Sequence, residues 1–226
     1  MSKVKGTKRT RKMDVLFLID STQSMSSAIQ AAHNKAEDLA FDLSNMRYRD
    51  VSFRFGCICY RDPVDSFLDV HQFFDFDPDI ENLSVYLGKV EAFGGGDIPE
   101  DFVGAIELTL NKLSWDEDAR KGIIWIADAP AHGKRFCGEE NHQEEEPKLE
   151  KLVKELAEKK FYFSGISING GVDQTFAEMK KIFDENGGKS FRIQSFSPDP
   201  KGEITDIEET LSKSTIDIVD DALKDF

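Results

Sequence analysis

The chain has 226 residues, of which 39% are hydrophobic and 11% are aromatic. This composition supplies a core for one large α/β domain and excludes a globally disordered chain. The 29 lysines and arginines are outnumbered by 43 aspartates and glutamates, so the formal net charge is −14. An acidic surface of this kind argues against general nucleic-acid binding, which needs cations facing phosphates.

The N-terminal segment is basic, with six cations and no acid in residues 2–12. We expect residues 1–12 to form a disordered leader and residues 13–226 to form a single domain. An address signal or an arm for an acidic partner is the alternative role of this leader. No apolar run is long enough to serve as a signal peptide or to span a bilayer, and three cysteines, an odd number, fit reduced thiols. We therefore expect a cytoplasmic protein without a membrane span.

Short apolar runs predict the strands. Runs without polar alternation are typical of parallel strands that helices cover on both faces. These runs are residues 14–19, 51–60, 122–127 and 161–168. Residues 66–74 alternate more and indicate an edge strand, and residues 189–196 predict the last strand.

Between the predicted strands, apolar residues recur with three-to-four spacing, which is typical of amphipathic helices. The pattern covers residues 25–45, 80–90, 102–113, 149–156 and 176–183, and a further helix is expected in the C-terminal tail. Pro99 and Pro147 fit first helical positions, and Thr205 with Glu208 fits a capping box at the start of the tail helix. Strands alternating with helices predict an α/β fold with a doubly wound, mostly parallel central sheet and helices on both faces.

Asp20 ends the first predicted strand, and Thr22 and Ser24 follow at alternate positions. In doubly wound sheets, ligands gather beyond the carboxyl ends of the strands. Two hydroxyls spaced by one residue can face the same side of a turn, and Mg²⁺ prefers hard oxygen ligands. Hydroxyl-rich coordination would leave the ion short of negative charge, so it would accept an anionic oxygen from a partner's aspartate or glutamate. The alternative interpretation is that these three side chains cap the following helix.

Two further segments carry the same kind of signal. In residues 93–106, three successive glycines allow close backbone approach to a ligand, and they are followed by Asp97 and by Pro99, which is predicted to open a helix. In residues 123–133, Asp128 stands at the end of another buried strand. Ordinary helix-start and turn chemistry would explain each segment separately, but their joint occurrence favours one common site.

The three segments together resemble the von Willebrand factor A domain family and its metal-ion-dependent adhesion site. "DSTQS" resembles that family's first metal-binding block, which implies direct metal ligands at Thr22 and Ser24 and a direct or outer role for Asp20. Asp128 matches the acid after the family's fourth core strand. "GGGDIPED", "YRD" and "DAPAHG" resemble the variety associated with α-type protein kinases. The resemblance covers roughly residues 13–196 and implies a Rossmann-like fold.

The resemblance also implies a cofactor and a partner: Mg²⁺, with Mn²⁺ or Ca²⁺ as alternatives, and a protein ligand offering an aspartate or glutamate carboxylate. One position departs from the family pattern. Most members supply a threonine from the glycine-rich loop, where this sequence offers Asp97 or, within one turn, Glu100. A carboxylate there would bind the metal more tightly and attract an acidic partner less strongly.

Other chemistries fit the sequence less well. His132, Cys137 and His142 could bind zinc, but their spacing matches no strong zinc pattern, and an exposed mobile loop is the simpler interpretation. An aspartate after a buried strand also begins haloacid-dehalogenase-like phosphatases, which need a second aspartate where Thr22 stands. The sequence contains neither a phosphate-binding loop nor a nucleophile elbow.

We therefore expect a magnesium-dependent protein-interaction module that is not itself an enzyme. The alternatives are the substrate-recruiting domain of an α-type protein kinase and a metal-dependent phosphoester hydrolase.

Overall fold

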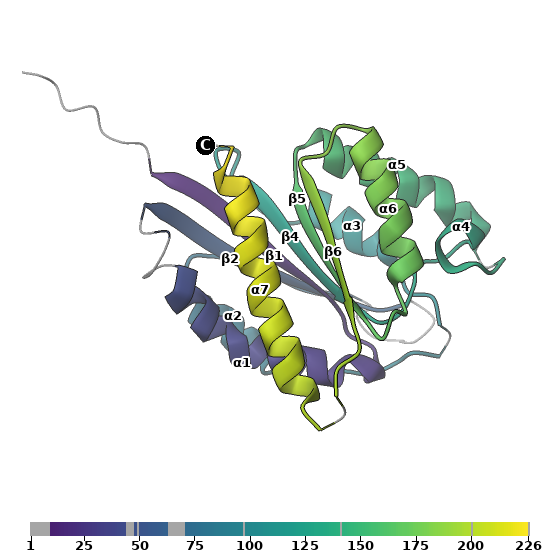
Figure 1. Cartoon of the computed structure of the whole chain (residues 1–226), viewed down its shortest axis with the longest axis horizontal. Coiled ribbons are helices and arrows are strands. Elements are labelled where there is room, and N and C mark those ends of the chain that lie inside the picture. The colour runs from purple at the N-terminus through teal and green to yellow at the C-terminus, as the bar shows by residue number, and fades with distance from the viewer. Residues whose placement is uncertain are drawn as a thin grey trace, which may run out of the picture.

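The computed structural model describes residues 10–43, 48, 50–62, 71–96, 98–140, 142–199 and 201–225. Within these ranges, one sheet has the strand order β3-β2-β1-β4-β5-β6 (Figure 1). Its strands are β1 (Arg11–Asp20), β2 (Val51–Tyr60), β3 (Gln72–Asp77), β4 (Arg120–Ala127), β5 (Tyr162–Ile168) and β6 (Ser190–Phe196). All neighbouring strands pair in parallel except β2 and β3, which are antiparallel. The predicted doubly wound, mostly parallel α/β fold is confirmed.

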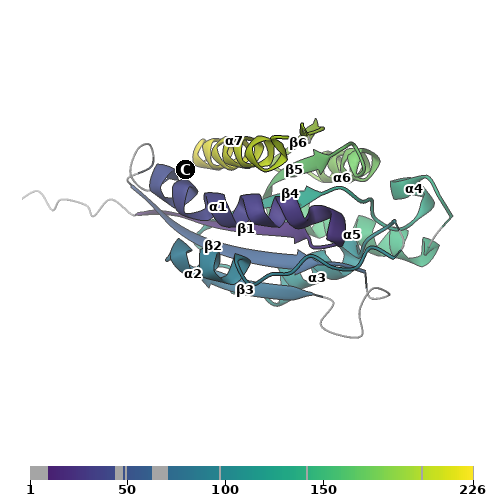
Figure 2. The same ribbon diagram turned by 90° about the horizontal axis from the view of Figure 1, so that it is seen from below.

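Helices cover both faces of the sheet. They are α1 (Ser26–Asp42), α2 (Ile80–Leu87), α3 (Phe102–Asn111), α4 (Lys134–Cys137), α5 (Glu146–Glu158), α6 (Asp173–Glu185) and α7 (Glu203–Leu223), with short 3-10 turns η1 (Gln23–Met25) and η4 (Gln143–Glu145). One core cluster joins the sheet to α1, α2 and α7, and the other joins it to α3, α5 and α6. Figures 1 and 2 show α7 lying alongside α1 over the same face.

The apolar run of strand β1 is uninterrupted because both faces of the strand are buried. Val15, Phe17 and Ile19 belong to one core cluster, whereas Leu16 and Leu18 belong to the other, and all five are buried. A strand covered on both faces needs apolar side chains at every position. Burial on both faces also fixes the register, since a one-residue slip would exchange the two sets.

The structure extends or shifts several predicted boundaries. β1 begins at Arg11, inside the predicted leader, because the backbone of β1 pairs with β2 from Arg11 opposite Val51 onward. Side-chain pairs of Arg11 with Asp50 at 2.5 Å and of Lys12 with Asp116 at 2.7 Å add to this end of the strand. Residues 1–9 of the predicted leader lie outside the described residues. The predicted edge strand at 66–74 appears as β3 at Gln72–Asp77, while residues 63–70 lie outside the described ranges.

Two predicted helix starts are wrong. α3 begins at Phe102 instead of Pro99, because the Asp101 carboxylate accepts a hydrogen bond from the backbone N–H of Gly104 at 2.6 Å and so caps the helix there. α7 begins at Glu203, so Thr205 lies inside the helix and does not cap it. By contrast, Pro147 does lie in the first turn of α5, as predicted.

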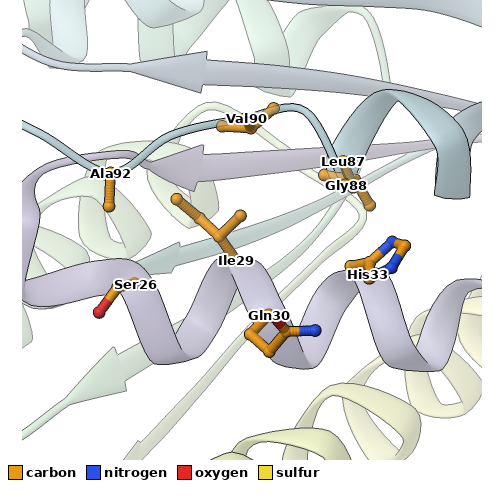
Figure 3. Close-up of a pocket in the computed structure, with 8 residues that line it drawn as sticks. All are labelled: Ser26, Ile29, Gln30, His33, Leu87, Gly88, Val90 and Ala92. Carbon is orange, nitrogen blue, oxygen red and sulfur yellow. The ribbon is translucent and has the colours of Figure 1, made fainter.

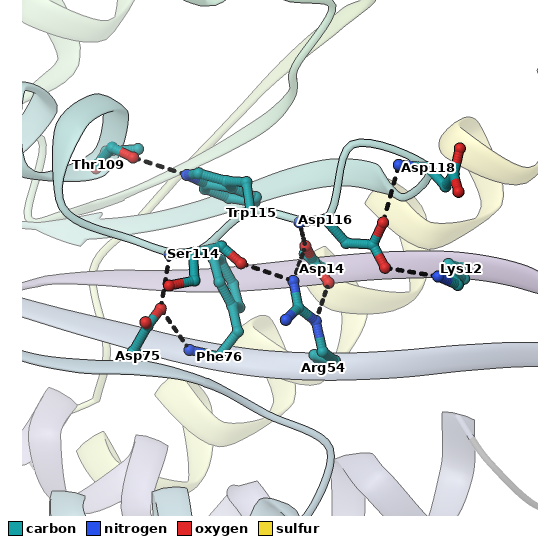
Figure 4. Close-up of polar contacts among 10 residues, drawn as sticks. All are labelled: Lys12, Asp14, Arg54, Asp75, Phe76, Thr109, Ser114, Trp115, Asp116 and Asp118. Carbon is teal, nitrogen blue, oxygen red and sulfur yellow. Dashed lines mark hydrogen bonds and ion pairs between the residues drawn. The ribbon is translucent and has the colours of Figure 1, made fainter.

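The amino-terminal edge of the sheet is closed by a polar cluster (Figure 4). Asp14 on β1 is buried and accepts two hydrogen bonds from Arg54 on β2, at 2.8 and 2.6 Å. The Asp14 carboxylate also accepts from the backbone N–H of Asp116, and Arg54 donates to the carbonyl of Ser114. This cluster fixes the loop between α3 and β4. In doubly wound sheets, ligands bind at the opposite edge, beyond the carboxyl ends of the strands.

Two further sequence-based expectations concern the cysteines and membrane spans. Cys57, Cys59 and Cys137 are free thiols, and the sulfurs of Cys57 and Cys59 lie 3.7 Å apart on β2. Among the helices of the described residues, none is both long and apolar enough to cross a membrane.

Candidate metal-ion site

The side chains predicted from separate segments meet at the carboxyl-terminal edge of the sheet. Asp20 is the last residue of β1, and Asp128 follows β4, which pairs directly with β1. Thr22 and Ser24 lie in the turn that leads through η1 into α1. Parallel strands end at the same edge, so neighbouring strands deliver these residues to one place.

Asp20 and Thr22 form the buried part of the cluster. The Thr22 backbone N–H and the Thr22 hydroxyl both donate to Asp20 Oδ1, at 2.9 and 2.7 Å. The Thr22 and Ser24 hydroxyl oxygens lie 3.3 Å apart. Thr22 stands at the N-cap position of η1, but its side chain makes no capping hydrogen bond. The helix-capping interpretation is therefore wrong for Thr22, whose hydroxyl instead faces the strand-end carboxylate.

Asp128 joins this cluster from β4. Burial raises its pKa, while the nearby side chain of Ser24 opposes that rise. Burial also raises the pKa of Asp20 to about 7, although Thr22 donates two hydrogen bonds to it, and the charge of nearby Asp128 adds to the rise. Ser24 is exposed and Asp20 is fully buried, so the cluster runs from the interior of the domain to its surface.

Each of the two carboxylates keeps one oxygen without a hydrogen bond. Asp20 Oδ2 and Asp128 Oδ1 are buried, and neither has a hydrogen-bond partner within the part of the chain that the structure describes. Although Asp128 as a whole is half-buried, two neighbouring carboxylates with buried, unpartnered oxygens are costly unless a cation compensates them. Carboxylate and hydroxyl oxygens are hard ligands, so these residues fit Mg²⁺ better than a soft metal ion.

The glycine-rich loop packs against the same cluster. Gly94 and Gly95 have φ values of 90° and 93°, a backbone region that favours glycine. The N–H of Phe93 donates to the carbonyl of Ser21 at 3.2 Å, and a Cβ on Gly95 would lie 3.7 Å from the Cβ of Thr22. Asp97, the predicted ligand from this loop, lies outside the described residues.

Glu100, the alternative to Asp97 as a metal ligand, uses its carboxylate in a contact with another segment of the chain. It is buried, and its carboxylate accepts a hydrogen bond from the backbone N–H of Asp62 at 2.7 Å. Its own N–H donates to the carbonyl of Pro130 at 2.9 Å, which forms a short parallel bridge with the segment after β4. Glu100 therefore ties together the segments that follow β2 and β4, and it does not lie in the first turn of α3.

Sequence reasoning missed a buried cation beside the cluster. Arg61 follows β2, is fully buried and donates to Ser21 Oγ at 2.8 Å and to the carbonyl of Glu91 at 3.3 Å. Its guanidinium carbon lies 3.7 Å from the centre of the Phe93 ring. The charge of Arg61 partly offsets the rise in the pKa of Asp20. Its position within "YRD" was the available signal, since that block was noted as part of the family pattern.

The predicted exposed loop around His132 is wrong at His132 itself. His132 is buried, and its Nε2 lies 2.6 Å from Asp62 Oδ2. His142 is exposed, its ring centre lies 4.6 Å from that of His132, and Cys137 hydrogen-bonds backbone carbonyls. Among the described residues, no three side chains of His, Cys, Asp or Glu are grouped as a metal would need. The zinc alternative thus has no support, and a magnesium site would depend on hydroxyls as well as acids.

The fold and the position of this cluster define a class of protein. The family model of the von Willebrand factor A domain matches residues 14–162, so the chain belongs to that family. Domains of this family are commonly protein-interaction modules.

One curated relative narrows the class further. The chain is 28% identical over 132 residues to "Alpha-protein kinase vwkA" of Dictyostelium discoideum, an alignment that covers 58% of this chain and 21% of the relative. The chain is thus a von Willebrand factor A domain that is similar to one from an α-type kinase, which agrees with the resemblance predicted from the sequence. It spans about a fifth of the length of that relative.

Solved structures support the fold alone. BatB from Bacteroides thetaiotaomicron is 14% identical with a TM-score of 0.54, and the match covers 92% of this chain and 99% of that one. The pilus adhesin SpaC from Lactobacillus rhamnosus GG is 10% identical with a TM-score of 0.59, covering 94% and 31%. Proximal thread matrix protein 1 from the mussel byssus is 14% identical with a TM-score of 0.54, covering 90% and 46%.

Proposed function

We propose that this domain binds Mg²⁺ at the carboxyl-terminal edge of its sheet and uses the ion to hold an acidic residue of a protein partner. Thr22, Ser24 and Asp128 would hold the ion directly. Asp20 would act directly or through a coordinated water, and Asp97 would contribute from the glycine-rich loop. When bound, Mg²⁺ supplies a positive charge and a coordination position for one carboxylate oxygen of the partner.

One observation supports the proposal above the others: the carboxylates of buried Asp20 and half-buried Asp128, at the ends of neighbouring strands, each keep a buried oxygen without a hydrogen-bond partner among the described residues. A domain gains nothing in stability from burying acids in this way, because desolvation disfavours both charges. A divalent cation between them would remove that cost. It would also reverse the local field of a chain whose net charge is −14, and so allow an acidic partner to approach.

Isothermal titration calorimetry with MgCl₂ tests the metal part of the proposal. Wild-type protein should give a one-site binding isotherm. Asp128→Asn and Thr22→Val should each weaken the affinity by at least about tenfold, since each removes one ligand oxygen or its charge. Glu117→Gln, which removes an exposed acid away from the site, is the matched control and should bind as wild type does. Equal isotherms for all four proteins would refute the site.

A second candidate function is recruitment of substrates for an α-type kinase. The relative named as an α-protein kinase favours it, although only a fifth of that protein is matched. In this case the partner of the metal site would be a phosphorylation substrate. Affinity capture on the immobilised domain, with Mg²⁺ or with EDTA, followed by exposure of the captured proteins to an α-type kinase, tests this. The candidate requires that the proteins released by EDTA are better kinase substrates than the unbound fraction.

A further inference from the structure

A pocket of about 220 Å³ opens beside the candidate metal site, between α1 and the chain that follows α2 (Figure 3). Its walls combine the apolar side chains of Ile29, Leu87, Val90 and Ala92 with the polar side chains of Ser26, Gln30 and His33. Ile29 and Leu87 are buried, whereas Val90 and Ala92 are half-exposed, so the floor is apolar and the mouth reaches solvent. An apolar cavity of about 150 Å³ is enough to hold a benzene ring, so this pocket has room for one large apolar side chain.

The same two chain segments, the start of α1 and the chain that follows α2, contribute to the pocket and to the candidate metal site. Ser26, which lines the pocket, comes two residues after Ser24 in the same helical turn. Ala92, on the opposite wall, immediately precedes Phe93, whose N–H donates to the carbonyl of Ser21. A partner segment that reaches the metal site along α1 therefore passes the mouth of the pocket.

The rim of the pocket offers one defined polar contact. His33 Nδ1 lies 2.9 Å from the carbonyl of Ser84, and a carbonyl only accepts hydrogen bonds, so Nδ1 carries the proton. In the neutral ring, Nε2 is then an acceptor. A backbone N–H of a partner segment could donate to it while an apolar side chain of that segment enters the pocket.

We propose that the partner of this domain carries an apolar side chain, aliphatic or aromatic, two to four residues from the carboxylate that meets the metal, and that this side chain occupies the pocket. The inference rests on the proposed function. Its spacing follows from geometry: Ile29 and His33 lie five and nine residues after Ser24, which is roughly 7 to 14 Å along a helix axis at about 1.5 Å per residue. An extended partner chain covers this distance in about two to four residues at about 3.4 Å each.

Selection of displayed peptides on the purified domain tests the proposal. The library carries a fixed central glutamate with about four random residues on each side, binding takes place in MgCl₂, and EDTA elutes the metal-dependent peptides. We expect enrichment of Leu, Ile, Met or Phe at a constant offset of two to four residues on one side of the glutamate. In a synthetic peptide of the selected sequence, replacing that residue with serine should weaken binding about tenfold or more.

Two variants assign the effect to the pocket. Ala92→Gln places a longer polar side chain in the pocket and should abolish the apolar preference while Mg²⁺ still binds in calorimetry. Ala177→Gln makes the same change at an exposed position of α6, on the other face of the sheet. This variant should select the same peptides as the wild-type domain. Should Ala92→Gln fail to fold, Val90→Thr changes polarity at nearly constant shape and should reduce the same preference.

The outcomes separate the two proposals. EDTA-sensitive peptides without an apolar preference, or a preference that survives both pocket variants, would overturn the inference and leave the metal-dependent function standing. A Mg²⁺-dependent dimer that Ala92→Gln dissociates would assign the pocket to a second copy of the chain and also overturn it. Absence of both EDTA-sensitive peptides and calorimetric Mg²⁺ binding would refute the proposed function, and the inference with it.

Discussion

At the scale of single residues, Asp20 is an acid whose charge the metal-free domain disfavours. It is fully buried, and its pKa is raised to about 7, first by burial and then by the charge of Asp128. A carboxylate of an unfolded chain titrates near 3.9. Because the folded pKa lies above the unfolded one, the stability contributed by protonated Asp20 is complete below about pH 4 and is lost as the pH rises through about 7.

The metal-free protein should therefore become less stable between pH 6 and pH 8. The expected loss from Asp20 is about 1 kcal/mol, and Asp20→Asn should remove this part of the pH dependence. Urea unfolding in EDTA at several pH values, compared with the same series in MgCl₂, measures it. Added Mg²⁺ should stabilise wild-type protein more at pH 8 than at pH 6, where protons compete with the ion. A stability that rises with pH in EDTA, and that Asp20→Asn leaves unaltered, would contradict this account of the site.

Gly171 is a second residue on which the geometry depends. A Cβ at this position would lie 1.7 Å from the carbonyl oxygen of Asp128, so any side chain displaces the backbone that carries the candidate ligand. Gly171→Ala should weaken Mg²⁺ binding and lower the free energy of unfolding by about 1 to 3 kcal/mol. Gly202→Ala is the control, because its Cβ would meet only Asp206 Oδ1 at 3.9 Å. Calorimetry and urea unfolding of both variants measure the effect, and the prediction is wrong if Gly171→Ala matches Gly202→Ala.

At the scale of elements, the two ends of the sheet have different tasks. The polar cluster of Asp14, Arg54 and the α3–β4 loop fixes β1 against β2 at the amino-terminal edge. Asp14 is buried and Arg54 is half-buried, so removing the Asp14 carboxylate leaves the Arg54 guanidinium and the Asp116 N–H without their acceptor, which costs about 1 to 3 kcal/mol. Asp14→Ala should therefore strongly destabilise the domain, with little effect on the Mg²⁺ affinity of the molecules that stay folded.

The contrast is with Lys12→Ala, which removes an exposed pair with Asp116 and should change stability little. Thermal unfolding of both variants, with calorimetry below the transition, tests the separation of the two edges. A loss of Mg²⁺ affinity in folded Asp14→Ala as large as that in Asp128→Asn would show that the edges are coupled.

The elements also show how far the sequence alone predicts this fold. Strand β1 was predictable because burial on both faces leaves an uninterrupted apolar run. The start of α7 was not, because Glu203 is held by the hydroxyl of Ser27 on α1, at 3.0 Å, and that contact joins residues 176 positions apart. A capping pattern such as Thr205 with Glu208 is a local signal, and here the tertiary contact extends the helix beyond it.

The same distinction holds for the candidate site. Asp20, Thr22, Ser24 and Asp128 could be predicted to meet, because each stands at or just after the end of a strand whose neighbour is deducible. The pair of Asp62 with His132 could not be predicted, since its members lie 70 residues apart and each has an ordinary alternative in a loop. Arg61 was missed for a related reason: the "YRD" block marks the segment as part of the family pattern, but it does not show that the arginine is buried and stacks on Phe93.

At the scale of the whole molecule, charge and shape point to the same surface. The net charge of −14 repels acidic ligands in general, so a cation at one edge of the sheet would make that edge the place where an acidic segment binds. The apolar pocket along α1 adds a contact that depends little on salt. With both contacts on one surface, the domain would gain selectivity for its partner.

Diffraction from crystals grown in MnCl₂ tests the central claim most directly, because manganese is located by its own anomalous signal. We expect one strong peak within coordination distance of the hydroxyls of Thr22 and Ser24 and of the Asp128 carboxylate, about 2.0 to 2.3 Å away as for other hard oxygen ligands. A map in which these oxygens have no peak between them, with manganese absent or bound elsewhere on the chain, would contradict the account.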